Sequence, residues 1–145
     1  MSRVKIKFPA ETPLIECFIP VRITDINYGN HLGNDRLLAI LHEARVQCLA
    51  QWKFTELNAG GNSLIMADVM IAYRGEAFYG DVLQIKIFTG EISERSFDLL
   101  YDISTERNNQ QISIAQAKTA MVCFDYEIRK VTLLKDELKA RLKGL

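Results

Sequence analysis

Residues 21–52 read VRITDINYGNHLGNDRLLAILHEARVQCLAQW, a polar turn followed by a long apolar pattern. In the second part, apolar side chains recur at spacings of three, four and seven: Leu37, Leu38, Leu41, Ala44, Cys48 and Leu49. This periodicity predicts a helix over residues 35–52, with Asn34 or Asp35 capping its first turn. Three more apolar residues widen the stripe: Ile40, Val46 and Trp52. We therefore expect the rest of the protein to cover this helix on several sides.

Most of the remaining sequence has the pattern of β-strands. Apolar and β-branched residues predominate, or alternate with polar ones, in five segments: residues 15–23, 64–73, 82–88, 97–104 and 111–124. Polar and glycine-containing turns separate the later segments. Leucines at four-residue spacing predict a short helix over residues 133–142. One long helix followed by consecutive strands indicates the α+β class, with an antiparallel sheet curved around the helix.

The composition is that of one globular domain. The chain has 145 residues, of which 48% are apolar and 25% charged, and this length is enough to enclose one core. We therefore expect a single domain over residues 1–145. The 18 basic residues balance the 18 acidic ones, whereas a general nucleic-acid binder usually has a basic excess.

The cysteines and the N-terminal residues predict a cytoplasmic protein. Cys17, Cys48 and Cys123 are widely spaced and form no C-x-x-C pair, so neither a zinc site nor a disulfide framework is predicted. We expect buried thiols in a reducing compartment. Residues 1–9 contain no apolar stretch of signal-peptide length. No run approaches the ~18 apolar residues that would indicate a membrane span.

The turn and the helix together resemble the signature of the 4-hydroxybenzoyl-CoA thioesterase family. That signature follows a strand with Asp-x-Asp-x-x-Gly-His-Val-Asn-Asn and then a helix that contains Glu-Ala-Arg. The matching segments here are Asp25-Ile-Asn27-Tyr-Gly-Asn-His31-Leu-Gly-Asn34, Glu43-Ala-Arg45 and a later Tyr79-Gly80-Asp81. The order and spacing of these segments carry the resemblance, which covers about residues 15–142.

The resemblance implies a hotdog fold, in which a curved antiparallel sheet wraps one long central helix. It implies a homodimer or homotetramer with active sites at the subunit boundary. The implied reaction is hydrolysis of acyl-CoA or of an acyl group on a carrier protein. No metal and no tightly bound cofactor are expected, because CoA or phosphopantetheine enters as part of the substrate. Neither nucleic acid nor a membrane is an expected partner.

One position departs from the family pattern. Asn27 stands where many family members have a catalytic aspartate, and an amide is neither a carboxylate nucleophile nor a general base at neutral pH. Some branches of the family hydrolyse thioesters with asparagine at this position and no acidic residue, and the helix arginine is implicated there. Asn27 and Arg45 match those two positions, and we favour this narrower resemblance.

Four residues are candidates for catalysis: Asn27, His31, Arg45 and Asp25. Asn27 is a candidate to orient the attacking water, and His31 is a candidate proton acceptor because histidine exchanges protons near neutral pH. Asp25 would share a face with Asn27 on an extended chain, so it is an alternative source of the missing carboxylate. Arg45 is a candidate to bind substrate or to support the site. Ordinary turn, capping and ion-pair roles are the structural alternatives.

Five further residues are candidates for substrate binding: Tyr28, Gly33, Asn34, Glu43 and Tyr79. The backbone N–H groups of residues 33–35 open the predicted helix and lack partners inside it, so they can hold an oxyanion. Tyr28 and Tyr79 are candidates to line an acyl or pantetheine tunnel. Glu43, in the middle of the helix, is also an alternative base. An ordinary helix start and half-buried tyrosines would give the same pattern.

Three functions follow from this pattern, in descending order of support. The first is a thioesterase in which Asn27, His31 and Arg45 position the reactants and the helix-start amides stabilise the oxyanion. The second is a hotdog protein that binds acyl thioesters without hydrolysing them, which the Asn27 departure favours. The third is a dehydratase or hydratase, although His31 lacks the neighbouring motif typical of those enzymes. The sequence does not identify the acyl chain.

Overall fold

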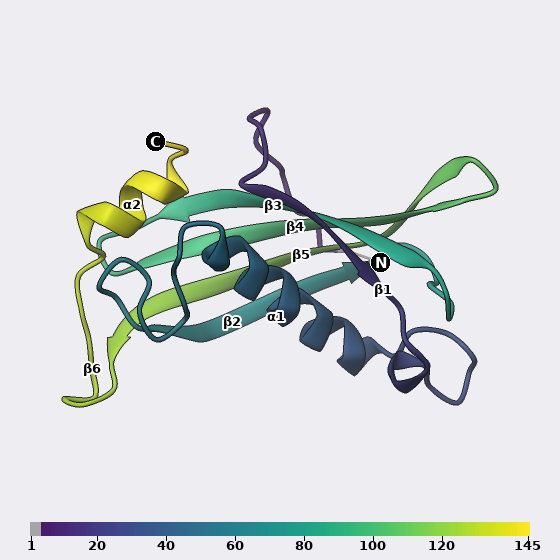
Figure 1. Cartoon of the computed structure of the whole chain (residues 1–145), viewed down its shortest axis with the longest axis horizontal. Coiled ribbons are helices and arrows are strands. Elements are labelled where there is room, and N and C mark those ends of the chain that lie inside the picture. Colours follow the sequence, from purple (N-terminus) through teal and green to yellow (C-terminus); the bar gives the residue numbers. More distant parts are fainter. Residues whose placement is uncertain (1–3) are drawn as a thin grey trace.

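The computed structural model describes residues 4–145 (Figure 1). Its elements are β1 (Ile15–Pro20), the 3₁₀ turn η1 (Ile23–Asp25), α1 (Asn34–Ala50), β2 (Leu64–Tyr73), β3 (Val82–Ile92), β4 (Ser96–Arg107), β5 (Gln110–Asp125), β6 (Lys130–Val131) and α2 (Asp136–Leu142). The strands form one antiparallel sheet in the order β1-β3-β4-β5-β2, and β6 pairs with β5. The predicted α+β class, with a helix lying across a curved antiparallel sheet, is confirmed.

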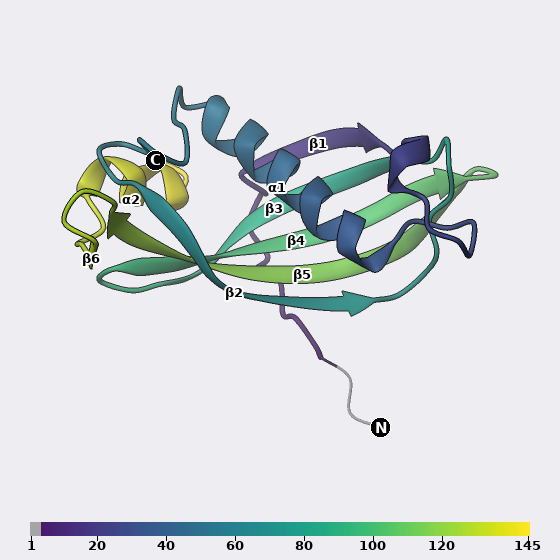
Figure 2. The same ribbon diagram turned by 90° about the horizontal axis from the view of Figure 1, so that it is seen from below.

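The core lies between α1 and the concave face of the sheet (Figure 2). On the helix, the predicted stripe is buried: Leu37, Leu41, Ala44 and Cys48 are each at most 1% exposed. On the sheet, alternate residues of β3 and β4 face the helix, as the two-residue period of a strand requires. These residues are Leu83, Ile85, Ile87, Leu99, Tyr101 and Ile103.

The outer side of α1 is not covered within this chain, contrary to the expectation from its broad apolar pattern. Ala39, His42 and Glu43 are exposed, and Val46 is 44% exposed. Ile40, in contrast, is buried. The apolar surface of α1 therefore extends beyond its contact with the sheet only on the side of Val46. One sheet can bury only the stripe that faces it, and no second layer lies over the helix among residues 4–145.

Several predicted boundaries shift for local reasons. β1 ends at Pro20 rather than at residue 23, because proline ends the regular strand and the chain turns into η1. The Asp25 carboxylate stabilises this turn by accepting the backbone N–H of Arg22 at 2.8 Å. The predicted C-terminal helix begins at Asp136, and the two-residue strand β6 was not expected.

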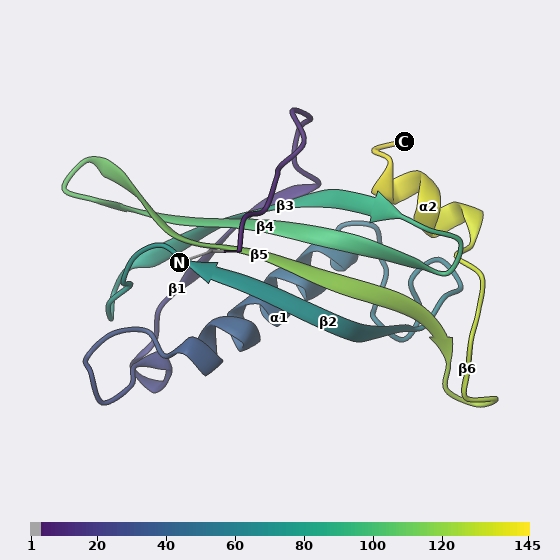
Figure 3. The same cartoon turned by 180° about the vertical axis from the view of Figure 1, so that it is seen from behind.

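The three cysteines are free and buried, as the sequence predicted. Burial raises the pKa of Cys17 and of Cys123 to about 11 and that of Cys48 to about 12. Such thiols behave as small core residues and are poor nucleophiles. The opposite face of the sheet is crossed by the N-terminal segment (Figure 3), where Phe8 packs edge-on against Phe88 at 5.4 Å between ring centroids.

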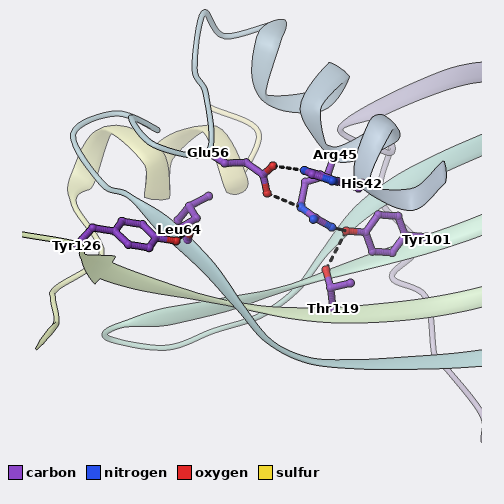
Figure 4. A network of polar contacts seen from close by, with 7 residues as sticks. All are labelled: His42, Arg45, Glu56, Leu64, Tyr101, Thr119 and Tyr126. Carbon is purple, nitrogen blue, oxygen red and sulfur yellow. Dashed lines mark hydrogen bonds and ion pairs between the residues drawn. The ribbon is translucent and has the colours of Figure 1, made fainter. Parts of the chain in front are cut away.

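A buried polar network fixes α1 to the sheet and to the loop that follows the helix (Figure 4). Arg45 is 5% exposed; its Nε donates to Glu56 Oε2 at 2.9 Å and its Nη1 donates to Tyr101 Oη at 3.2 Å. Tyr101 Oη is bonded in turn to Thr119 Oγ1 at 2.8 Å. His42 Nε2 contacts the other oxygen of Glu56. The network therefore joins α1, the loop at Glu56, β4 and β5.

We predict that Arg45→Ala lowers the free energy of unfolding by about 1–3 kcal/mol, because it removes the hydrogen bonds of a charged group to the buried Tyr101 and the half-buried Glu56. Urea denaturation monitored by circular dichroism measures this loss. Arg36→Ala, an exposed arginine on the same helix, is the control and should change the stability by less than about 0.5 kcal/mol. Equal losses in the two variants would show that the network contributes no net stability.

The same network predicts a pH dependence of stability. Burial opposes ionisation of Glu56, but hydrogen bonds and charge from Arg45 and His42 outweigh it and lower its pKa. A carboxyl with a lowered folded-state pKa stabilises the fold above the unfolded pKa of about 4.3. This contribution is lost as the pH falls through the lowered pKa. The stability advantage of wild type over Glu56→Gln should therefore shrink in acid, and an advantage that stayed constant down to acid unfolding would contradict the assignment.

Candidate active site

The turn between η1 and α1 is closed by its own backbone. Asn27 N–H donates to the His31 carbonyl at 3.0 Å, and Asn30 N–H donates to the Asn27 carbonyl at 3.1 Å. Asn30 adopts a left-handed conformation, with φ of 65°, which asparagine tolerates better than most residues. The turn therefore holds Asn27 and His31 side by side, at the point where α1 begins.

Hydrogen bonds within the turn define which side-chain atoms of Asn27 and His31 accept and which donate. Asn27 Oδ1 accepts the N–H of Gly29 at 2.9 Å. His31 Nδ1 lies 3.0 Å from the Leu32 carbonyl, and because a carbonyl only accepts, Nδ1 carries the hydrogen and Nε2 of the neutral ring has a free lone pair. A Cβ atom on Gly29 would lie 3.1 Å from His31 Nε2 and 3.2 Å from Asn27 Oδ1. Both polar atoms thus approach the space that this glycine leaves open.

The start of α1 provides fewer free amides than the sequence suggested. Gly33 is the N-cap residue, and its N–H donates to the Asp25 carbonyl at 3.0 Å. The expectation that this amide holds an oxyanion is therefore wrong, because its hydrogen bond is already made within the turn. The N–H groups of Asn34 and Asp35 have no acceptor within the described part of the chain, so they remain candidate donors.

A cavity of about 140 Å³ opens beside these amides, between the start of α1 and the end of β2. Its polar lining consists of His31, Asn34, Tyr73 and Glu76, together with the backbone of Gly33. Tyr73 Oη donates to the Asn34 carbonyl at 3.1 Å. Burial, with a smaller effect of Asp35, raises the pKa of Tyr73, so the phenol keeps its proton at neutral pH.

Sequence reasoning did not identify Tyr73 and Glu76 as site residues. They lie at the end of a predicted strand and directly after it, a position that often carries functional side chains. No local pattern, however, indicates that residues 73–77 lie against residues 31–34. That neighbourhood depends on a long-range hydrogen bond, from the N–H of Leu32 to the carbonyl of Ala77 at 2.8 Å.

A larger groove, of about 490 Å³, lies between β1 and α1 and contains two other candidate residues. Asp25 is 4% exposed. Its carboxylate accepts the backbone N–H of Arg22 at 2.8 Å and forms an ion pair with Arg22 Nε at 3.6 Å. Glu43 accepts from Gln47 Nε2 at 3.2 Å. This groove is larger than the cavity at the start of α1, but His31 and the residues that open α1 do not line it, and Asn27 lines neither space. We therefore place the candidate active site at the smaller cavity.

The remaining candidates lie elsewhere in the chain. Arg45 is twelve residues beyond Gly33, which corresponds to ~18 Å along α1, and its hydrogen bonds belong to the buried network. Tyr28 is fully exposed and Tyr79 is 67% exposed, and neither lines the cavity. Within one chain, the structure thus brings together Asn27, His31 and the start of α1, but not Arg45 or the two tyrosines.

Two further classes of site can be assessed for residues 4–145. No group of three or more His, Cys, Asp or Glu side chains in that range is arranged to hold a metal ion. No helix in the same range is long and apolar enough to cross a membrane.

Comparisons with known proteins identify the family. No protein of curated function matches the chain. Among solved structures, a 1,4-dihydroxy-2-naphthoyl-CoA thioesterase from Synechocystis, Slr0204, is similar in fold at 22% identity, with a TM-score of 0.78 over 90% of this chain and 96% of that one. The probable thioesterase YbaW of Escherichia coli is 28% identical, with a TM-score of 0.72 over 88% and 96% of the two chains. Residues 21–142 match the family model of the thioesterase-like superfamily, and the chain therefore belongs to that superfamily.

Proposed function

We propose that this protein hydrolyses acyl thioesters of CoA or of a phosphopantetheine carrier at the cavity beside the start of α1. One observation carries the proposal: His31, whose Nε2 has a free lone pair, and Asn34, whose amide is unpaired, line the same small cavity, and the unpaired amide of Asp35 follows directly in the chain. Hydrolysis of a thioester requires these two elements, an acceptor that positions water and donors that stabilise an oxyanion.

The proposed reaction proceeds by attack of water on the acyl carbon. His31 Nε2 accepts a hydrogen bond from this water, and Asn27 restricts where the water and the thioester can lie. The developing oxyanion takes hydrogen bonds from the amides of Asn34 and Asp35, where the positive end of the α1 dipole adds to the stabilisation. The attacking water gives up one proton, which the departing sulfur takes as the C–S bond breaks, so the products are a thiol and a carboxylic acid.

Arg45 acts through the fold in this proposal. Glu56 and Tyr101 hold its guanidinium, and it supports the reaction by fixing α1 against the sheet. No resident metal or cofactor has a role, since the CoA or phosphopantetheine belongs to the substrate. The three free, buried cysteines support a cytoplasmic site of action, where thiols stay reduced.

A panel that contains both aromatic and aliphatic CoA esters should be used to identify the acyl group. Two proteins of similar fold are called a 1,4-dihydroxy-2-naphthoyl-CoA thioesterase and a gentisyl-coenzyme A thioesterase, which favours aromatic acyl groups in the first panel. The cavity of about 140 Å³ is small, so short and aromatic chains should be tested before long ones.

We expect wild type to release thiol from at least one acyl-CoA of such a panel, and Asn27→Ala and His31→Ala to lower the rate about 10-fold or more. A thiol-reactive dye measures the release. Gln110→Ala, which changes an exposed residue that does not line the cavity, is the control and should leave the rate within about threefold of wild type. Binding of acyl-CoA without any hydrolysis would instead support the alternative function, a protein that binds thioesters without cleaving them.

We also propose that two copies pair through β2. This strand is hydrogen-bonded to β5 on one side and is an edge of the sheet among the described residues. Its exposed apolar residues are Ile65, Met66, Val69, Met70 and Tyr73, each 36–44% exposed. The strand has no proline, and its one charged residue, Asp68, is paired with Lys118 of β5 at 2.9 Å. A long, largely apolar edge strand of this kind favours pairing with a second copy.

Val69→Lys should shift the protein from dimer towards monomer, because it places two like charges near the symmetry axis of the paired strands. Sedimentation velocity at several concentrations measures the change. Ile128→Lys substitutes a residue in the turn between β5 and β6 that is 60% exposed and should leave the dimer intact. A wild type that stays monomeric at all concentrations would rule out the proposed pairing.

A further inference from the structure

The cavity at the start of α1 is lined by an exposed acidic residue that lies outside the family signature. Glu76 lies in the connection between β2 and β3, and among the residues that line this cavity it alone has an acidic side chain. The carboxyl group of Glu76 makes no hydrogen bond or ion pair with any residue from 4 to 145. It is therefore available to a molecule in the cavity.

The backbone around Glu76 is held firmly on both sides. The N–H groups of Arg74 and Gly75 both donate to the Ile114 carbonyl, at 2.8 and 3.1 Å. A Cβ atom on Gly75 would lie 2.7 Å from the Ser113 carbonyl oxygen, so only glycine allows this close approach to β5. Arg107 Nη2 donates to the Glu76 carbonyl at 2.9 Å. The Glu76 side chain therefore projects from a fixed backbone rather than from a free loop.

The other carboxylates near the turn are already engaged or lie outside the cavity. Asp25 is buried and bonded to Arg22. Asp35 Oδ1 lies against Gly33, 2.9 Å from where a Cβ atom would be, and Glu43 lines the separate groove. Asn27 is an amide. Glu76 is thus the group in the cavity with the chemistry that Asn27 lacks.

We propose that Glu76 is the general base of the reaction, an assignment that rests on the proposed function. A water that donates one hydrogen to His31 Nε2 and the other to the Glu76 carboxylate keeps a lone pair for the acyl carbon. As the C–O bond forms, one proton passes to Glu76. Collapse of the oxyanion breaks the C–S bond, and the leaving thiolate takes the proton from Glu76. The carboxylate is restored, and the products are a carboxylic acid and a thiol.

Thiol release by Glu76→Gln tests this assignment. Glutamine keeps the shape and removes the base, so kcat should fall about 100-fold or more, with KM within about threefold. Glu106→Gln changes another exposed glutamate and should behave as wild type.

A second variant tests whether Glu76 replaces the missing carboxylate of the turn. In the Glu76→Gln background, Asn27→Asp should restore kcat about 10-fold or more, since aspartate can also accept the Gly29 N–H. An active wild type whose kcat survives Glu76→Gln would overturn the assignment and leave the thioesterase proposal standing. A wild type that releases no thiol from any ester would overturn both.

Discussion

The burial of one face of α1 against the concave sheet determines where every candidate group lies. Leu37 and Leu41 are at most 1% exposed, so the helix cannot rotate without exposing them, at a cost of roughly 2 kcal/mol for each side chain. With the rotation fixed, its free amides open towards the end of β2. Arg45 fixes the helix again two turns further on, because a buried guanidinium must remain with Glu56 and Tyr101.

The candidate site combines three backbone segments that hydrogen bonds join directly. Gly33 is bonded to Asp25, and Leu32 to Ala77, while the Tyr73 hydroxyl is bonded to the start of α1. In this arrangement, the carboxylate that serves as a base need not belong to the turn that contains Asn27. A side chain on the β2–β3 connection reaches the same cavity, so an asparagine at position 27 does not by itself indicate a site without a base.

Local patterns predicted most of the fold, and long-range contacts account for what they missed. The helical spacing around Leu41 predicted α1 because one sheet buries that stripe. The same spacing does not show that Arg45 points into the core, because only Glu56 and Tyr101 make that burial favourable. Asn27 and His31 were predictable as neighbours because a short turn joins them. Glu76 was not predictable as their neighbour, because it comes from a segment more than forty residues away.

The proposed pairing edge and the proposed active site share one part of the molecule. Tyr73, at the end of β2, is 44% exposed on the sheet edge, lines the cavity and donates to the first residue of α1. A second copy paired along β2 would therefore cover the edge next to this wall of the cavity. The same pairing would bring the partner's surface towards the exposed amides and Glu76, excluding water from groups whose electrostatic effects strengthen as water leaves. The proposed pairing along β2 would thus complete a site that a single chain builds but does not enclose.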